Sequence, residues 1–202
     1  MKKVRIGILI SGRGSNMSAL IEACRAADFP AEVALVFCNV ETALGLTLAA
    51  EAGIATKAFS HKGFASREDF DAAVDAALVA AGIELICEAG FMRIHSEGFV
   101  RKWEGRMLNI HPSLLPSFKG VKVQQQALDA GVKISGCTVH FMVPELDSGP
   151  IIAQAAVPVL EGDTAETLAA RILVEEHKLY PAALRLVAEG KVRLENGRAV
   201  FD

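Results

Sequence analysis

The feature that most constrains the fold of this chain is the alternation of short apolar runs with segments of helical periodicity across its first half. The first run covers residues 4–10, and apolar residues then recur at helical spacing behind Ser15, a suitable N-cap. The strand pattern returns three times, at residues 33–38, 54–59 and 83–89. Helices are expected between these strands, at residues 43–52 and from Ser66 to the terminating Gly82. Such alternation is typical of a parallel sheet flanked by helices.

The C-terminal part of the chain follows a different order. A helix is expected near residues 96–103, and strands are expected at residues 106–110, 137–143 and 151–157. A further helix should open at Asp163, with Glu166 completing a capping box, and Asn196-Gly197 indicates a two-residue β-hairpin. We therefore predict an α/β, Rossmann-like fold. Its mostly parallel twisted sheet should be flanked by helices on both faces and have an antiparallel edge portion in the C-terminal third.

Length and composition favour one domain. The 202 residues, of which 51% are hydrophobic, are enough to bury a core, and no repeat, low-complexity tract or linker interrupts them. We therefore expect a single domain over residues 1–202. The cysteines form no CxxC pair and lie mostly in apolar runs, so we expect buried small side chains rather than a metal or redox site. They are Cys24, Cys38, Cys87 and Cys137.

The sequence also limits the location and the partners of the protein. No apolar stretch of signal-peptide or membrane-span length follows Met1, which predicts a cytoplasmic protein without a membrane partner. The net charge is −3, and no cluster of basic residues is interleaved with aromatic ones, which argues against nucleic acid as the main partner. A monomer and a homodimer are both compatible with the sequence.

Glu88 is the exception in the apolar run of residues 83–89. A buried carboxylate without a partner is costly. We therefore expect the Glu88 side chain to turn toward solvent.

The first segment that could take part in binding or catalysis is Ser-Gly-Arg-Gly-Ser-Asn at residues 11–16, between a predicted strand and a predicted helix. Glycines let the backbone approach a ligand closely, and the helix N-terminus offers free N–H groups, which together favour a phosphate. A dinucleotide fingerprint would need a third glycine at the position of Met17. A turn with a purely structural role is the alternative.

The second segment is Asn-Ile-His-Pro-Ser-Leu-Leu-Pro at residues 109–116, at the end of a predicted strand. Residues two apart in a strand face the same side, so Asn109 and His111 can reach one small volume at the carboxyl edge of the sheet. An amide donor beside an imidazole suits acyl transfer, because the donor stabilises an oxyanion while the imidazole moves a proton. Hydrogen-bonded structural residues are the alternative. The sharp exit from this strand makes the Leu115–Pro116 bond a candidate cis peptide.

The third segment is Glu-Leu-Asp-Ser-Gly-Pro-Ile at residues 145–151, a tight turn between two predicted strands. If this turn lies beside His111, the Asp147 carboxylate can fix the imidazole tautomer and favour its protonated form. An aspartate that only initiates the turn is the alternative.

The second and third segments together resemble the signature of the formyltetrahydrofolate-dependent formyltransferase family. Residues 11–16 are similar to the phosphate loop of the branch that formylates glycinamide ribonucleotide in purine synthesis. Residues 89–94 (Ala-Gly-Phe-Met-Arg-Ile) and 176–181 (Glu-His-Lys-Leu-Tyr-Pro) match that branch too. The resemblance covers nearly the whole chain. Residues 119–125 depart from it, because they lack the histidine that is usual there.

The resemblance implies an enzyme that uses N10-formyltetrahydrofolate as co-substrate and needs no metal. The glycinamide amine would attack the formyl group directly, through a tetrahedral intermediate. The implied catalytic trio is Asn109, His111 and Asp147. The residues implied to bind glycinamide ribonucleotide are Gly14, Ser15, Asn16 and Glu176. The residues implied to line the folate pocket are Arg67, Met92, Arg93, Ile94, His95 and Asn109.

Other functions remain open at this point. A formyltetrahydrofolate deformylase would use the same trio for hydrolysis, but it normally carries an N-terminal regulatory domain, whereas the first strand is expected here at Val4. A formyltransferase acting on methionyl-tRNA would carry an extra C-terminal domain. A non-catalytic nucleotide-binding module would use only the loop at Gly14 and would leave the trio unexplained.

Overall fold

The computed structural model describes residues 2–202, which form two compact units. The first unit ends at Leu108, and the second runs from Asn109 to Asp202. The prediction of a single domain over residues 1–202 stays a prediction.

The first unit is built from four strands and four helices among its described residues. Its strands are β1 (Val4–Ile10), β2 (Ala31–Cys38), β3 (Thr56–Ala58) and β4 (Leu85–Glu88). Its helices are α1 (Ser15–Cys24), α2 (Leu44–Glu51), α3 (Arg67–Ala80) and α4 (Glu97–Lys102), with a 3₁₀ turn η1 (His61–Gly63). Strand β5 (Met107–His111) contains the boundary between the units.

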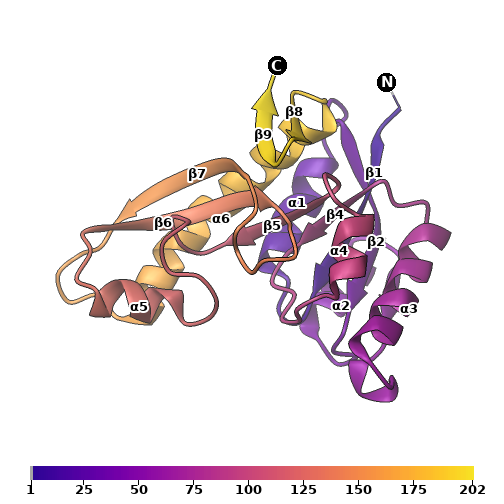
Figure 1. The fold of residues 1–202 in the computed structure, drawn as a ribbon, viewed down its shortest axis with the longest axis horizontal. Coiled ribbons are helices and arrows are strands. Elements are labelled where there is room, and N and C mark those ends of the chain that lie inside the picture. The colour runs from indigo at the N-terminus through magenta and orange to yellow at the C-terminus, as the bar shows by residue number, and fades with distance from the viewer. Residues whose placement is uncertain (1) are drawn as a thin grey trace. The chain divides into compact units, whose positions relative to one another are not determined.

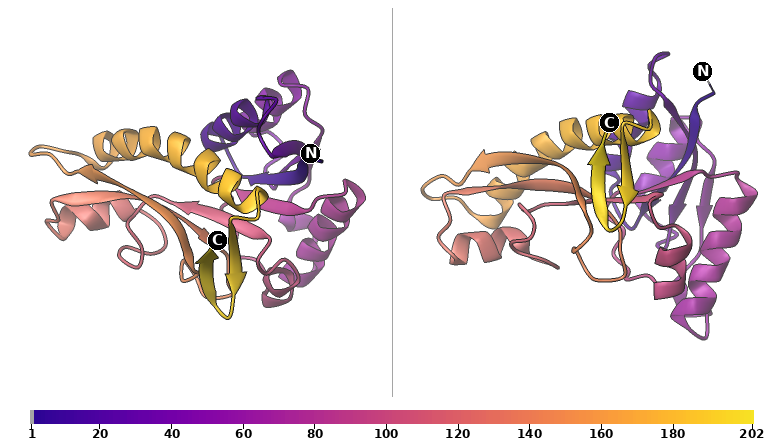
Figure 2. Two further views of the ribbon diagram at one scale, coloured as in Figure 1. Left: turned by 90° about the horizontal axis from the view of Figure 1, so that it is seen from above. Right: turned by 45° about the horizontal axis from the view of Figure 1, so that its top comes forward.

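The strands of the first unit are parallel. β1 pairs with β2 on one side and with β4 on the other, and β2 pairs with β3. Helices α1 and α2 contact each other over one face of these strands, and α3 and α4 contact each other over the opposite face (Figures 1 and 2). The predicted parallel sheet with helices on both faces is therefore confirmed.

Helices α1 and α3 of this unit begin in different ways. The Ser66 hydroxyl accepts a hydrogen bond from the Asp69 N–H at 3.0 Å, so the predicted cap of α3 is confirmed. For α1, however, Ser15 is the first helical residue and Gly14 occupies the N-cap with φ +75°. The prediction that Ser15 caps this helix was wrong, because the chain enters α1 through a left-handed conformation that glycine adopts without strain.

The second unit holds the antiparallel part of the structure. Its elements are α5 (Val123–Asp129), β6 (Ile134–Phe141), β7 (Ile151–Pro158), α6 (Ala165–Ala188), β8 (Val192–Glu195) and β9 (Arg198–Phe201). Strands β6 and β7 pair antiparallel, as predicted for the C-terminal third. Across the described residues 2–202 the strand order of the main sheet is β3-β2-β1-β4-β5-β6-β7, while β8 and β9 form a separate hairpin. Helix α5 was not expected from the sequence.

The hairpin and the start of α6 test two predictions from local sequence. Asn196 and Gly197 have φ of +50° and +73°, as a two-residue turn of the predicted kind requires. Helix α6 is capped by Thr164 with Thr167 in a reciprocal capping box, so the prediction of Asp163 with Glu166 was wrong. Asp163 is instead held outside the helix by two hydrogen bonds from Arg171.

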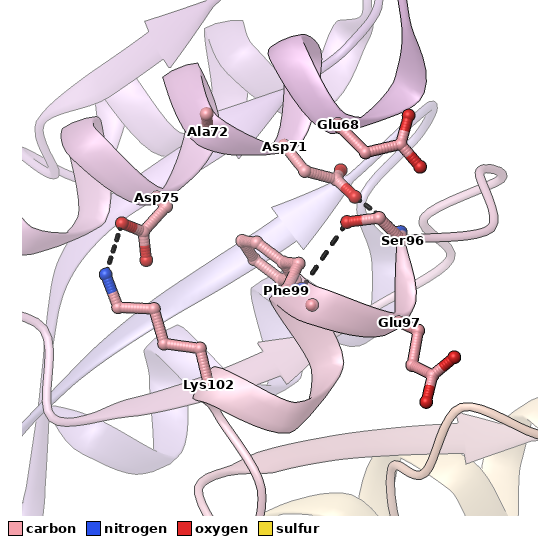
Figure 3. Close-up of a pocket in the computed structure, with 9 residues that line it drawn as sticks. Glu68, Asp71, Ala72, Asp75, Ser96, Glu97, Phe99 and Lys102 are labelled. Atoms are coloured by element: carbon pink, nitrogen blue, oxygen red, sulfur yellow. Dashed lines mark hydrogen bonds and ion pairs between the residues drawn. The ribbon is translucent and has the colours of Figure 1, made fainter.

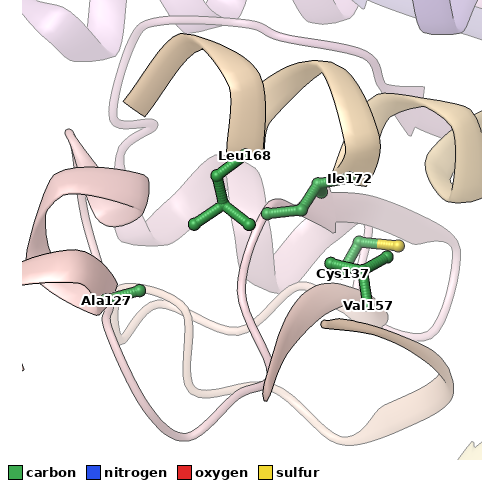
Figure 4. Packing of buried hydrophobic residues seen from close by; sticks show 5 residues of the cluster. All are labelled: Ala127, Cys137, Val157, Leu168 and Ile172. Carbon is green, nitrogen blue, oxygen red and sulfur yellow. The ribbon is translucent and has the colours of Figure 1, made fainter. Parts of the chain in front are cut away.

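Helix α6 packs on the β6–β7 pair and also contacts α5. Figure 4 shows the apolar cluster at this junction, to which α5, β6, β7 and α6 all contribute side chains. Its buried members are Ala127, Cys137, Val157, Leu168 and Ile172. No helix within residues 2–202 is both long enough and apolar enough to cross a membrane.

The cysteines are free and buried, as predicted. Burial raises the pKa of the Cys24 thiol to about 11, although the charge of Lys3 acts in the opposite direction. Burial, with a contribution from the charge of Glu176, raises the pKa of Cys137 to about 12. These thiols are core side chains rather than nucleophiles.

Candidate active site

The second unit places His111 and Asp147 side by side. His111 ends β5, and its Nδ1 lies 3.6 Å from Oδ1 of Asp147, with both side chains more than nine-tenths buried. The other ring nitrogen, Nε2, lies 2.8 Å from the carbonyl oxygen of Phe118. Because a carbonyl can only accept, Nε2 is the donor in this contact. Nδ1 is therefore the nitrogen that faces the carboxylate.

The turn between β6 and β7 fixes the position of Asp147. Asp147 has φ +46°, a left-handed conformation that aspartate tolerates better than most residues, and its Oδ2 accepts a hydrogen bond from the Gly120 N–H at 2.7 Å. Gly149 packs so closely that a Cβ atom there would lie 1.7 Å from the carbonyl oxygen of Phe141. The contact from Gly120 uses backbone, so the unusual side chains of residues 119–125 do not remove it.

Asn109 is oriented by a histidine that the sequence analysis missed. His140 lies in β6 with its Nδ1 at 2.9 Å from the carbonyl oxygen of Phe141, so Nδ1 carries a proton. Burial lowers the pKa of His140, which favours the neutral ring. Its Nε2 can then accept from the Asn109 amide, whose Nδ2 is 3.4 Å away. The only sequence signal for His140 was its place as a polar residue within the mainly apolar run of residues 137–143.

The segment after β5 is held by hydrogen bonds from β6 and β7. The Leu115 N–H donates to the Thr138 hydroxyl, and the Gln154 amide donates to the Leu115 carbonyl. The Leu115–Pro116 bond is cis, which confirms the prediction.

In the first unit, the loop before α1 has the geometry expected of an anion-binding turn. A Cβ atom at Gly14 would lie 2.9 Å from the Met17 side chain and 3.2 Å from the backbone of Gly45, so the position requires glycine on steric grounds as well. Ser15 and Asn16 form the first turn of α1, the end of the helix whose dipole favours an anion.

The predicted folate-binding residues of this unit have different environments. Met92 and Ile94 have 68% and 58% of their surface exposed, and Arg67 is exposed at the start of α3. The His95 side chain is buried. In the second unit Glu176, a predicted nucleotide contact, is buried on α6.

Glu88 contradicts its prediction. It is only 4% exposed, and its Oε1 lies 2.7 Å from Nε2 of His95. The expectation that Glu88 turns to solvent was wrong, because a histidine seven residues later folds back onto it and no local pattern indicates that contact.

In the first unit, Ser11 connects the loop that contains Gly14 with the loop that contains Met92. Its hydroxyl accepts a hydrogen bond from the Met92 N–H at 2.7 Å and donates to Oδ1 of Asn39 at 2.6 Å. The loop at Gly14 and the loop at Met92 are therefore tied through one side chain.

A hollow of about 400 Å³ lies between α3 and α4 (Figure 3). Four of the residues that line it are acidic, and one is basic: Glu68, Asp71, Asp75, Glu97 and Lys102. This balance of charge is unfavourable for a phosphate or a carboxylate ligand. We therefore do not assign a substrate to this hollow.

Comparison with known proteins gives one consistent result. A family model described as "Formyl transferase" matches residues 4–184. The chain is 41% identical over 199 residues to the phosphoribosylglycinamide formyltransferase of Escherichia coli K12, covering 98% of this chain and 94% of the relative. It is 53% identical to a bovine protein named trifunctional purine biosynthetic protein adenosine-3, but it spans only 20% of that relative's length.

A solved structure agrees with these relatives. The crystal structure of glycinamide ribonucleotide transformylase 1 from Symbiobacterium toebii superposes with a TM-score of 0.96 at 48% identity. The match covers 98% of this chain and 94% of that one.

Proposed function

The chain belongs to the formyl transferase family, and from this premise we propose that it transfers the formyl group of N10-formyltetrahydrofolate to the amine of glycinamide ribonucleotide. The observation that carries the proposal is the buried contact between His111 and Asp147 at the end of β5. Asn109, two residues earlier in the strand, presents an amide that His140 orients. An oriented donor and a proton carrier are what a direct acyl transfer needs.

In the proposed reaction the glycinamide amine attacks the formyl carbon, and a carbon–nitrogen bond forms as the carbonyl oxygen becomes an oxyanion. The Asn109 amide donates to this oxyanion. Collapse of the intermediate breaks the bond to N10 of the folate, and the proton lost by the amine reaches N10 through His111 and a water held by Asp147. The products are the formylated ribonucleotide and tetrahydrofolate.

The Nε2–H of His111 donates to the Phe118 carbonyl at 2.8 Å, so Nε2 can pass a proton to the reacting groups only after this hydrogen bond breaks. We therefore expect the segment from Pro112 to Phe118 to shift when formylfolate binds. This shift would couple substrate binding to the freeing of the proton donor.

We also propose which residues contact each substrate. Gly14, Ser15 and Asn16 would bind the phosphate of glycinamide ribonucleotide through the N-terminus of α1, and Glu176 would contact the same substrate. Arg67 and the backbone of residues 92–95 would line the folate pocket, together with Asn109. We further propose that residues 1–202 act as one domain in the cytoplasm, as a monomer or a homodimer, without a nucleic-acid or membrane partner.

The test is an absorbance assay for loss of formylfolate, run with and without glycinamide ribonucleotide. We expect turnover only when both substrates are present, and stoichiometric formation of the formylated ribonucleotide. Turnover without the ribonucleotide would instead indicate a deformylase. Binding of the ribonucleotide with no turnover under either condition would favour a non-catalytic module.

A further inference from the structure

His95 lies between two buried carboxylates. Its Nδ1 is 2.9 Å from Oδ1 of Asp71 on α3, and its Nε2 is 2.7 Å from Oε1 of Glu88 on β4. The ring has no exposed surface, and the two carboxylate side chains are 3% and 5% exposed. A neutral imidazole has one N–H, whereas the imidazolium has two. Only the imidazolium donates to both carboxylates at once.

Two aromatic rings also stack against His95. Phe91 stacks on one side with ring centroids 5.1 Å apart, and Phe99 of α4 stacks at 4.3 Å. The charged groups that face the ring are thus Asp71 from α3 and Glu88 from β4, while α4 contributes an aromatic face. Burial alone would lower the pKa of His95, but the charge of Glu88 and the hydrogen bonds to both carboxylates raise it to about 9.

This cluster forms one of two anchors of the loop that precedes α4. Asp71 also accepts a hydrogen bond from the Ser96 N–H at 2.5 Å, and Ser96 caps α4 (Figure 3). At the other end of the loop, Ser11 binds the Met92 N–H, and the Ser11 N–H donates to the Gly90 carbonyl at 3.1 Å. Residues 92–94 are therefore fixed at both ends.

The middle of the loop is open. Met92 and Ile94 expose more than half of their surface, although both are apolar. A short segment without helix or strand structure, held at both ends and exposing apolar side chains on either side of Arg93, is suited to bind a flat aromatic ligand. The position of its backbone depends on the anchors, because no regular hydrogen-bond pattern fixes it from within.

We propose that His95 is a positioning residue for formylfolate, which acts as an imidazolium between Asp71 and Glu88 to hold residues 92–94 in the shape that binds the folate ring. The inference rests on the proposed function, because it takes these residues as part of the folate pocket. Loss of the proton breaks one of the two contacts and lowers the fraction of molecules in the binding shape. Apparent affinity falls in proportion to that fraction.

The test compares the wild type with Glu88→Gln by calorimetric titration of formyl-dideazafolate, a stable formylfolate analogue, across a pH series. Glutamine can accept from the His95 N–H through its oxygen or donate to the neutral ring through its nitrogen, so the variant keeps this contact in both protonation states of His95. We expect equal dissociation constants at about pH 6. At about pH 9.5 the wild type should bind about fourfold more weakly than at pH 6, because only about a quarter of His95 is then the imidazolium, whereas the variant should keep its affinity.

Asp75→Asn is the matched control. Asp75 lies one turn further along α3 and bonds Lys102 and Trp103 rather than the loop. We expect its dissociation constant to follow the wild-type pH curve, even where its melting temperature falls. A purely structural role for the cluster predicts lower stability of Glu88→Gln with an unchanged pH curve, and that result would overturn the inference.

The outcomes separate this inference from the proposed function. A wild type that binds no analogue at any pH overturns both. A wild type that binds, with Glu88→Gln following the same pH curve, overturns only the role of His95. If Glu88→Gln does not fold, Asp71→Asn provides the same comparison, because its amide oxygen can still accept from Ser96.

Discussion

Replacing Asp147 with asparagine tests the proposed catalytic pair with little change in shape. Asparagine adopts the left-handed conformation that Asp147 has, and its amide oxygen can still accept from the Gly120 N–H. The group facing Nδ1 of His111 can become an amide donor, however, instead of a carboxylate. The substitution therefore removes the negative charge beside His111 while keeping the turn.

The distance sets the scale of the effect. Two unit charges at the observed 3.6 Å interact by about 4.6 kcal/mol at an effective dielectric constant of about 20. That energy corresponds to about 10³-fold in rate, within the range of about 10²- to 10⁴-fold for a lost acid or base. We expect kcat to fall by about 10²- to 10³-fold, with little change in KM for either substrate.

Stability should change far less than turnover. The hydrogen bond from Gly120 loses its charged partner, a cost of about 1 kcal/mol. For a chain of this length that lowers the melting temperature by about 2–4 °C.

The assay measures kcat, both KM values and the melting temperature on the same preparation of Asp147→Asn. Ser148→Ala is the control, because Ser148 lies in the same turn and its hydroxyl bonds Lys119 and Leu146 rather than His111. We expect its kcat to stay within about twofold of the wild type, as for most surface substitutions. Near-normal turnover of Asp147→Asn would refute the argument and leave Asp147 as a residue of the turn.

Three further predictions follow from other parts of the structure. Asn16→Ala should raise KM for glycinamide ribonucleotide while leaving KM for formylfolate nearly unchanged, because a phosphate far from the reacting amine contributes mainly binding energy; steady-state kinetics would show it, and equal losses would contradict the assignment. Because the pKa of His95 is raised to about 9, its contribution to stability is complete below about pH 6.5 and is lost as pH rises through about 9. The melting temperature should therefore fall across that pH window more in the wild type than in Glu88→Gln. Gly149→Ala should cost more than about 3 kcal/mol of unfolding free energy in urea, since its Cβ would overlap the Phe141 carbonyl, and a smaller loss would mean that the turn can move.

Local sequence was sufficient for much of the fold, whereas the pairing of two site residues was only a hypothesis at that level. Alternating strand and helix patterns predicted the parallel strands of the first unit, because each pattern depends on residues a few positions apart. The interpretation of Asp147 as a neighbour of His111 agrees with their 3.6 Å separation. The catalytic roles of these residues stay predictions.

The contacts that were missed form only when a loop turns back or when another element packs nearby. Glu88 looked like an unpaired carboxylate because its partner His95 becomes a partner only when the intervening loop turns back, and Asp71 arrives from another helix. His140 reaches Asn109 across 31 positions. Periodicity predicts neither the path of a loop nor which elements pack together, so neither contact had a local signal.

The buried cysteines can serve as probes of local unfolding. A thiol that is enclosed and held in its protonated form reacts with a disulfide reagent only while its surroundings are transiently unfolded. Cys24, Cys38 and Cys87 belong to the first unit and Cys137 to the second, so the labelling rate of each thiol measures how often its own part of the chain opens. Residue-resolved labelling would therefore show, without any substitution, whether the two units unfold locally at the same rate. Labelling with substrate present would show in which unit binding slows local unfolding.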